Sequence, residues 1–479
     1  MSSRVGRTAV VYFGTQVGST VAGFAATWYI NNVLGAGVFG EFSTAVALMF
    51  WLNIPASALG ESVKKRMSEG DAPGEYAAAG HLLTLAVHVA LAGGLLATAE
   101  QVNVFVGAPV APYLAALVFA RAVFDVTVSI LRGEKQVGTS GGVKTFERVV
   151  RSGVHIGALF FLGVGIAGLV AGYAVSLLVA TAAGLVAIEG RPAVPDRRHA
   201  VSILEYARFA WLGTLKTRAF AWTDVMVMRG LSLSIVGLAA VTKTQIGVYK
   251  VSWAVASVLA LASIGIKETL FPELSDLGAD DEYGRVKHFV TEGLTFSGVV
   301  AIPGLFGAVA VGDTILTIFG AEYAVGGTIL VVLVGARLLA AYAGQLIGAI
   351  NAIDRPDVAF RVNLAYVVAN VSLNLALVAL FGWYGAAAAT VASAGFSLLA
   401  AGWALSTLIG LPELPVGEVA KQVGAAAGML LVVVALQRVV PGTLAWTLVV
   451  VGVGAAVYGA LLFALSATVR RKSLSLLPT

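Results

Sequence analysis

The sequence predicts an all-α integral membrane protein with about fourteen transmembrane helices. Of its 479 residues, 58% are hydrophobic and only 12% are charged, against about 25% charged residues in an ordinary soluble domain. A soluble protein of this size cannot bury so much apolar surface, so much of the surface must face lipid. Apolar runs of about 20 residues, long enough to cross a bilayer, recur along the chain. Lys and Arg are concentrated in alternate connections between these runs, as the positive-inside rule requires.

The apolar runs place each expected span in turn. The spans lie at 8–30, 40–60, 77–99, 111–131, 143–162, 168–188, 206–231, 245–266, 289–312, 326–350, 358–380, 386–409, 416–437 and 446–468. The weakest is 143–162, because Lys144, Glu147, Arg148 and Arg151 occupy its first part. We expect that run to begin as an amphipathic segment at the membrane interface.

The distribution of cations predicts the topology. Of the 31 Lys and Arg residues, 22 fall in the inner segments when the N-terminus is placed inside, two fall in the outer segments, and seven fall within spans. This asymmetry predicts cytoplasmic N- and C-termini, and therefore an even number of spans in the cell membrane.

The composition also excludes several kinds of site. The chain has no cysteine, which excludes disulfides, thiolate metal sites and cysteine nucleophiles. It has no G-x-x-x-x-G-K-[ST] loop, so we do not expect ATP to be the direct energy source. It has no H-E-x-x-H motif, and we expect no catalytic site and no bound metal. Nothing indicates nucleic-acid binding, because the basic segments are short cytoplasmic loops.

Short motifs indicate an internal repeat. Residues 39–42 (F-G-E-F) open the second expected span, and residues 246–249 (I-G-V-Y) open the eighth, 207 residues later. A G-x-x-G motif at 165–168 matches another at 382–385. These matches predict two parallel six-helix lobes related by pseudo-symmetry, an arrangement typical of transporters with a substrate site between the halves. We place the lobes at 1–205 and 206–409, followed by two helices and a cytoplasmic tail at 410–479.

Four motifs resemble one known family. They are G-A-G-V-F-G-E-F-S at 35–43, I-G-V-Y at 246–249, F-P-E-L-S at 271–275 and the N-A-I-D-R-P turn at 351–356. They resemble the polysaccharide transporter branch of the multidrug/oligosaccharidyl-lipid/polysaccharide exporter superfamily, over about residues 8 to 466. The resemblance implies a two-lobed flippase that moves polyprenyl-(pyro)phosphate-linked oligosaccharide from the cytoplasmic to the outer leaflet by alternating access. Glycan-assembly enzymes are then candidates for further partners.

Cations near mid-depth are the candidate substrate-binding residues, because ionisable groups within spans are costly and mark a pathway. Arginine and lysine there could hold the lipid phosphate, and the planar fork of arginine can donate two hydrogen bonds to it. The candidates are Arg121, Lys216, Arg218, Lys250 and Arg337. Arg121 and Arg337 are 216 residues apart and so fall at nearly equivalent positions of the two repeats.

Each cation also has a structural interpretation. Arg121 and Asp125 lie four residues apart and could form an internal ion pair. Lys216 and Arg218 could be neutralised by Asp224. Lys250 could extend to the interface, as we expect for Arg208 and Arg229 near span ends.

Glu41, Asp125 and Asp224 are candidates for a coupling site for Na+ or H+, since a carboxylate in a wet cavity can titrate or bind a cation. Balancing nearby arginines is the alternative role, and we favour it for Asp125. A proton relay through His81 and His88 is conceivable, but packed histidines are commoner.

Polar stripes mark two spans. Gln16, Thr20, Gly23 and Thr27 share one face of span 1 and are expected to line a hydrophilic cavity. In span 11, Asn363, Asn370 and Asn374 recur at helical spacing, and either a cavity or interhelical hydrogen bonds would explain them.

Three rival functions remain open. A cation-coupled multidrug antiporter of the same superfamily would need an acidic, aromatic cleft, whereas bases outnumber acids within these spans. A membrane-embedded polyprenyl-sugar glycosyltransferase or polymerase would need a large outer loop, and the longest outer connections, 232–244 and 313–325, have about a dozen residues. A non-transporting assembly protein would not need seven intramembrane cations.

Overall fold

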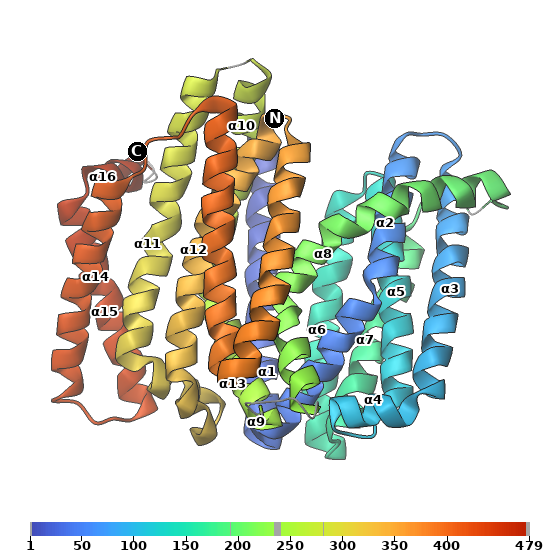
Figure 1. Ribbon diagram of the computed structural model, residues 1–479, viewed down its shortest axis with the longest axis horizontal. Helices are drawn as coiled ribbons and strands as arrows, with labels where there is room; N and C mark the ends of the chain where they lie inside the picture. The colour runs from blue at the N-terminus through green and yellow to red at the C-terminus, as the bar shows by residue number, and fades with distance from the viewer. Residues whose placement is uncertain (1, 192, 234–240, 281, 476–479) are drawn as a thin grey trace. The chain divides into compact units, whose positions relative to one another are not determined.

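The computed structural model describes residues 2–191, 193–233, 241–280 and 282–475, and in these ranges every regular element is a helix. Each expected span overlaps one of these helices or one half of a broken helix (Figure 1). The prediction of an all-helical membrane fold is thus confirmed. Apolar runs predict helices well because a membrane-crossing segment must satisfy its backbone hydrogen bonds internally.

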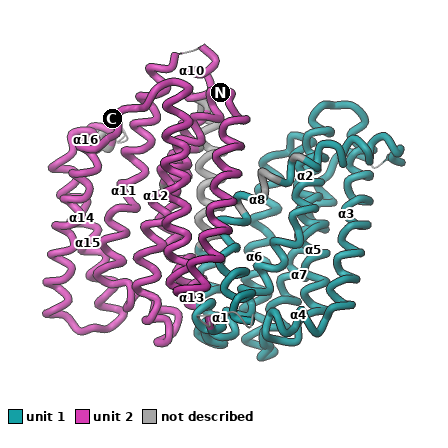
Figure 2. Tube along the Cα trace, in the orientation of Figure 1, with its two compact units in different colours: residues 1–235, 242–247 teal, residues 236–241, 248–479 magenta. Residues whose placement is uncertain are grey.

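The chain divides into two compact units, shown in teal and magenta in Figure 2. The first comprises Met1–Ile235 and Thr242–Gly247, and the second comprises Val236–Val241 and Val248–Thr479. The lobe boundary that we place at residue 205 from sequence therefore falls within a helix of the first unit, Arg197–Leu233. Its helices are α1 (Ser2–Leu52), α2 (Ile54–Ser68), α3 (Pro73–Ala97), α4 (Ala99–Val106), α5 (Ala111–Gly133), α6 (Val137–Leu162), α7 (Ile166–Ala187) and α8 (Arg197–Leu233).

The second unit contains the remaining helices, except for the first residues of α9, which belong to the first unit. These helices are α9 (Lys243–Leu259), α10 (Leu261–Ala279), α11 (Tyr283–Leu316), α12 (Gly327–Ala352), α13 (Pro356–Ile409), α14 (Val416–Gln437), α15 (Leu444–Leu465) and α16 (Ala467–Ser475). Two short 3-10 turns, Thr317–Phe319 and Ala321–Gly326, connect α11 to α12.

Two glycines break the longest helices. Gly35 in α1 has φ 76° and ψ 171°, and Gly382 in α13 has φ 57° and ψ −135°. Glycine adopts such positive-φ conformations without the steric cost that a side chain brings. Each of these helices therefore consists of two halves that meet at the glycine, and each half corresponds to one expected span (α13 is orange in Figure 1).

By length and composition, nine described helices could cross a membrane, or ten when α9 and α10 are taken as one bent span. This number is lower than fourteen partly because α13 holds two expected spans in one helix. In addition, α6 and α8 carry several charged residues, which lower their apolar character. The total of fourteen spans stays a prediction.

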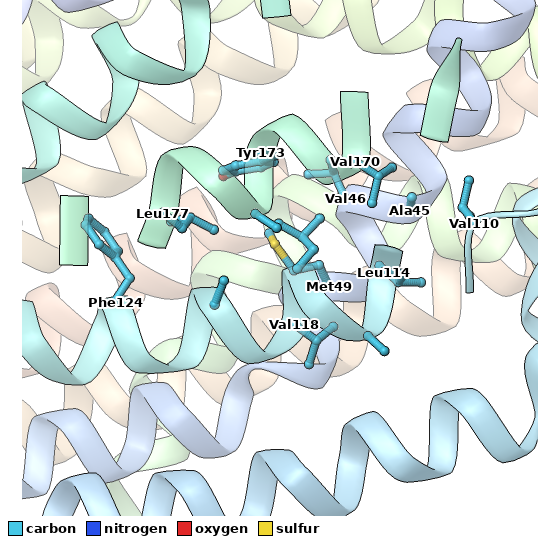
Figure 3. Close-up of a cluster of buried hydrophobic side chains, with 14 of the residues drawn as sticks. Ala45, Val46, Met49, Val110, Leu114, Val118, Phe124, Val170, Tyr173 and Leu177 are labelled. Atoms are coloured by element: carbon cyan, nitrogen blue, oxygen red, sulfur yellow. The ribbon is translucent and has the colours of Figure 1, made fainter. Parts of the chain in front are cut away.

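The core of the first unit forms where α1, α5 and α7 meet. Figure 3 shows Met49 of α1 among side chains of the other two helices, including Leu114, Val118 and Val170. All of these side chains are buried. Because lipid is as apolar as these residues, close packing rather than the hydrophobic effect holds such helices together.

Two glycines also bring α1 and α9 into backbone contact within the first unit. A Cβ atom added to Gly40 would lie 1.9 Å from the carbonyl oxygen of Lys243, and one added to Gly247 would lie 2.0 Å from that of Ala36. These are the glycines of the two matching motifs, F-G-E-F and I-G-V-Y. The similarity of the motifs therefore reflects, at least in part, one close helix contact.

The C-terminal end of α4 binds two cations in the first unit. The Arg229 side chain donates to the carbonyl oxygens of Phe105 at 2.5 Å and Val104 at 2.8 Å. Lys243 donates to the carbonyl of Gly107 at 2.7 Å and also pairs with Glu41. Cations are favourable at a helix C-terminus, where carbonyl groups lack helical partners. The expectation that Arg229 extends to the interface is wrong, since only 8% of it is exposed.

In the second unit, one carboxylate joins the start of α14 to the chain beyond α15. Glu418 accepts hydrogen bonds from Ser466 at 2.5 Å, from Lys421 at 2.8 Å and from Thr468 at 3.3 Å. The helix α16, with its basic residues 470–472, begins at this junction.

Candidate functional site

A polar cavity of about 480 Å³ lies inside the first unit, among α2, α5, α6 and α8. We call it cavity 1. Its lining residues are Ser57, Glu61, Arg121, Asp125, Val128, Ser129, Arg132, Lys144, Tyr206, Ala210 and Arg218. Its volume falls within the range of about 300–1,000 Å³ typical of small-molecule sites.

Both carboxylates of cavity 1 have basic partners. Arg121 makes two contacts with Asp125, from Nη2 to Oδ1 at 2.8 Å and from Nε to Oδ2 at 3.0 Å. Glu61 pairs with Lys64. The ion pair suggested by the spacing of Arg121 and Asp125 is therefore present, and Arg121 still lines the cavity.

Arg218 is held in cavity 1 by an aromatic ring rather than by a carboxylate. Its guanidinium lies 4.3 Å from the ring centroid of Phe50, and its Nη2 is 3.5 Å from Ser57 Oγ. Its buried Nε donates no hydrogen bond within the described residues. A buried donor without a partner is costly. Within the described residues, no carboxylate pairs with Arg218.

Arg132 and Lys144 complete the cationic lining, and sequence reasoning missed both as binding residues. Neither makes an ion pair with any part of the chain that the structure describes. We counted them as cytoplasmic cations because they lie near span ends. A useful signal was available for Lys144, since Lys144, Arg148 and Arg151 recur at helical spacing on one face of α6.

That face of α6 bears on a second expectation, for an amphipathic start at the membrane interface. The charged start of span 143–162 continues without a break into the rest of the span, because α6 runs as one helix from Val137 to Leu162. Lys144 lines cavity 1, and Arg148 and Arg151 line a second cavity. These charges face the interior of the unit, which explains how an apolar helix can carry them.

The second cavity of this unit, cavity 2, has a volume of about 380 Å³. It is lined by Gly23, Ala26, Thr27, Ile30, Phe39, Phe42, Val46, Phe50, Arg148, Arg151, Ser152, His155, Tyr173 and Trp222. Gly23 and Thr27 belong to the polar stripe of span 1, for which we expect a cavity. Gln16 and Thr20 belong to the same stripe, but their side chains lie outside those that the structure describes.

Lys216 and Arg218 are separated by the helix geometry of α8. Residues two apart point in different directions on a helix, and Arg218 lines cavity 1 whereas Lys216 is not among its described lining residues. Asp224 is 2% exposed, and its Oδ1 accepts a hydrogen bond from the backbone N–H of Val225 at 2.8 Å.

The other two candidate cations lie in the second unit around one tryptophan. The Arg337 guanidinium lies 4.0 Å from the ring centroid of Trp253, and Lys250 Nζ lies 5.6 Å from it. Arg337 also donates to Ser257 Oγ. Lys250 is 7% exposed, so it does not extend to a surface.

Other polar candidates have structural partners. Glu41 pairs with Lys243. His88 is fully buried and contacts the carbonyl of Thr84 at 2.9 Å. Asn370 donates to Ser393 at 3.0 Å, which joins the two halves of α13. For Asn370, the structure thus supplies the interhelical hydrogen bond that was one of the two interpretations.

No group of three His, Asp or Glu side chains suited to a metal occurs in the described ranges.

Sequence comparisons identify two similar curated proteins. Residues 75–325 match the model of the family described as polysaccharide biosynthesis protein. The protein named probable flippase AglR of Haloferax volcanii is 30% identical over 482 residues, which cover 99% of each chain. The probable low-salt glycan biosynthesis flippase Agl15 of the same organism is 28% identical over 375 residues, 77% of each chain.

Solved structures with the same fold include transporters. The lipid II flippase MurJ, in an inward closed conformation, matches with a TM-score of 0.81 at 13% identity, over 97% of this chain and all of that one. An inward-facing multidrug resistance MATE transporter of the MOP superfamily matches with a TM-score of 0.69 at 12% identity, over 81% of this chain and 95% of that one. At such identities, these matches establish the fold alone.

Proposed function

This chain belongs to the polysaccharide biosynthesis protein family, as its motifs predict, and from that premise we propose that it is a flippase for lipid-linked oligosaccharide. It is a multi-pass membrane transporter rather than an enzyme. In the proposed reaction, it carries polyprenyl-(pyro)phosphate-linked oligosaccharide from the cytoplasmic to the outer leaflet of the cell membrane by alternating access. The proposal places both termini in the cytoplasm.

The observation that carries the proposed mechanism is the cationic lining of cavity 1. Four basic side chains line this one space, while its two carboxylates each already have a basic partner. Like charges repel strongly where water is scarce, so such a cavity is more stable with an anion inside. We propose that the phosphate of the lipid carrier is this anion, held by Arg218 with Arg132 and Lys144.

The same lining argues against an antiporter for organic cations. A cationic drug would enter a cavity whose free charges are positive, and it would find no unpaired carboxylate among the described lining residues. Repulsion would therefore oppose its binding.

We propose a Na+ or H+ gradient as the energy source, with Asp224, Asp125 and Glu41 as the candidates for the coupling site. At Asp125 and Glu41, a coupling cation would compete with the basic residue that each carboxylate already pairs with. If vesicles transported the lipid equally well without either gradient, this part of the proposal would be wrong.

The test of the substrate site uses purified protein in liposomes with a fluorescent oligosaccharide linked to polyprenyl pyrophosphate. An impermeant quencher reports the fraction of lipid that has crossed. We expect Arg218→Gln to slow crossing about tenfold or more, since a hydrogen bond to a charged group contributes about 1.5–3 kcal/mol. Arg438→Gln, at an exposed position between α14 and α15, is the matched control and should cross at the wild-type rate. Equal rates for all three proteins would remove Arg218 from the site.

A further inference from the structure

A third cavity, of about 800 Å³, lies in the second unit at one end of its long helices. We call it cavity 3. It is bounded by α11, α14, α16 and the connection between α13 and α14. The helix α14 begins at this end and α15 finishes there, next to α16 (Figure 1). Because α14 and α15 are each long and apolar enough to cross a membrane, cavity 3 lies at the depth of the lipid headgroups.

Hydrogen bonds and ion pairs hold the walls of cavity 3 together. Thr291 of α11 donates to the carbonyl of Glu413, in the connection between α13 and α14, at 2.7 Å. Lys472 of α16 pairs with Glu292 of α11 at 2.6 Å. The hydrogen bonds of Glu418 tie α14 to the chain around the start of α16. The cavity is therefore formed before a ligand enters, which reduces the entropy lost on binding.

One cation of this lining has no carboxylate partner in the part of the chain that the structure describes. Two of the three Lys and Arg side chains among the described lining residues, Lys421 and Lys472, are paired with carboxylates. The third, Arg471, makes one hydrogen bond, from Nε to the carbonyl of Ala467 in its own helix at 3.4 Å. The carboxylate of Glu413 also lines the cavity, but this residue is exposed, so water and salt screen its charge. The other donors of Arg471 can therefore bind an anion.

Apolar side chains complete the lining of cavity 3. Phe296, Leu414 and Pro415 line it, and Leu414 is 63% exposed. The neighbouring Val416 is 68% exposed. A phospholipid can use both kinds of surface, with its phosphate at the arginine and the first carbons of its chains on the apolar side chains. A soluble phosphate compound would leave the apolar side chains uncovered.

We propose that cavity 3 binds the headgroup of an anionic phospholipid of the surrounding membrane, and that Arg471 holds its phosphate. The proposal concerns the second unit alone and does not rest on the proposed function. The guanidinium fork of Arg471 can donate two parallel hydrogen bonds to phosphate oxygens. Basic pockets at the ends of membrane helices are suited to such headgroups. A zwitterionic lipid is a poorer occupant, because its ammonium group would bring a second positive charge close to Arg471.

The test measures the binding of short-chain lipids to the full-length protein in detergent at physiological salt. The probes are dihexanoyl phosphatidylglycerol, dihexanoyl phosphatidylcholine and glycerol phosphate, and isothermal titration calorimetry gives each Kd. We expect the wild type to bind the phosphatidylglycerol about tenfold more tightly than the phosphatidylcholine, the lower end of what a hydrogen bond to a charged group contributes. Glycerol phosphate should bind about tenfold or more weakly than the phosphatidylglycerol, since it has no chains to cover the apolar side chains.

Two adjacent arginines of α16 provide a matched pair of variants. Arg471→Gln should reduce the preference for phosphatidylglycerol to less than about twofold. Arg470→Gln removes the same charge one residue earlier, at an exposed position that is not among the described lining residues, and should keep the wild-type preference. Arg471→Lys, which retains the charge without the fork, should keep about a threefold preference.

Three results would overturn the site. The first is a wild type without a preference, and the second is an equal loss of preference in Arg470→Gln and Arg471→Gln, which would reduce the effect to general surface charge. The third is an undiminished preference in Arg471→Gln or, if that variant aggregates, in Arg471→Lys. If glycerol phosphate binds as tightly as the phosphatidylglycerol, the ligand is a soluble phosphate compound and the assignment to a lipid is wrong.

Discussion

Phe50 positions the positive charge of Arg218 without neutralising it. Its ring attracts the guanidinium group of Arg218 through its quadrupole, whereas Arg121, which it also contacts, is paired with Asp125. Trp253 contacts two cations of the second unit. A carboxylate would cancel much of the charge, whereas a ring fixes the side chain and leaves the charge available. Aromatic contacts are therefore well suited to prepare a site for an anion.

The sequence predicts a charged site residue only where the charge lies at an unusual position, deep within an apolar run. Arg121 and Arg218 stand out because each lies deep in an apolar run. Arg132 and Lys144 do not, because a cation near a span end is ordinary. Their role depends on the cavity they face, which is a property of helix packing. The same limit explains the error at Arg229, whose partners are carbonyls at the end of α4, far away in sequence.

We expect Arg229→Gln to lower the midpoint of thermal unfolding by several degrees. The change removes charged donors from two carbonyls at a helix end, and such hydrogen bonds contribute about 1.5–3 kcal/mol. Fluorescence-detected size exclusion after heating measures the midpoint in detergent extracts. Arg208→Gln is the control on the same helix, because the Arg208 side chain is exposed. If both variants melted at the wild-type temperature, the α4 contacts would be unimportant for stability.

For a single helix, an apolar run predicts that the helix exists and roughly where it ends. It does not predict where the helix breaks or which way its charged face points. The sequence predicts separate spans on either side of Gly35 and Gly382, and the structure joins each pair as one helix broken at the glycine. Nothing in a run of small residues distinguishes such a break from a loop. The orientation of α6 was missed for a related reason, since charges on a helix can face either a membrane interface or a cavity.

The contact between α1 and α9 gives a sharp test at this scale. Gly40→Ala would place a methyl group 1.9 Å from the Lys243 carbonyl oxygen, so the two backbones must separate. We expect this variant to reduce both the folded yield and the crossing rate several-fold, because the close approach cannot survive a side chain. Both are measured on protein purified in parallel with the wild type.

Gly37→Ala is the matched control, three residues earlier on the same helix. Its added methyl group would lie 3.6 Å from Thr244 Oγ1, an ordinary contact. Alanine also has the higher helix propensity. Wild-type behaviour of Gly37→Ala together with a defect in Gly40→Ala supports the contact, and equal behaviour of the two variants would contradict it.

For the whole molecule, the sequence predicts the membrane class, the helical fold and the family, and the comparisons confirm these. The compact units are harder to predict, because the first extends through α8 to residue 235 and regains residues 242–247. A sequence repeat marks similar segments, whereas a compact unit is defined by which helices pack together. The two need not have the same limits.

The topology can be tested directly because the chain has no cysteine. Single variants Ser68→Cys and Thr443→Cys place one thiol at an exposed end of α2 and one just before α15. With cytoplasmic termini, an impermeant maleimide added to intact cells should label Thr443→Cys and leave Ser68→Cys unlabelled until the membrane is permeabilised. The opposite pattern would invert the orientation. Labelling of both positions in intact cells would mean an even number of spans between them and would contradict the predicted odd number.

Glu418 has a consequence for how the protein sits in the bilayer. Its hydrogen bonds to Ser466 and Thr468 join the start of α14 to the chain just beyond the end of α15. Neither helix can then move along the membrane normal without breaking these hydrogen bonds. The three basic residues of α16 are thereby kept at a constant depth, where they can bind acidic lipid headgroups.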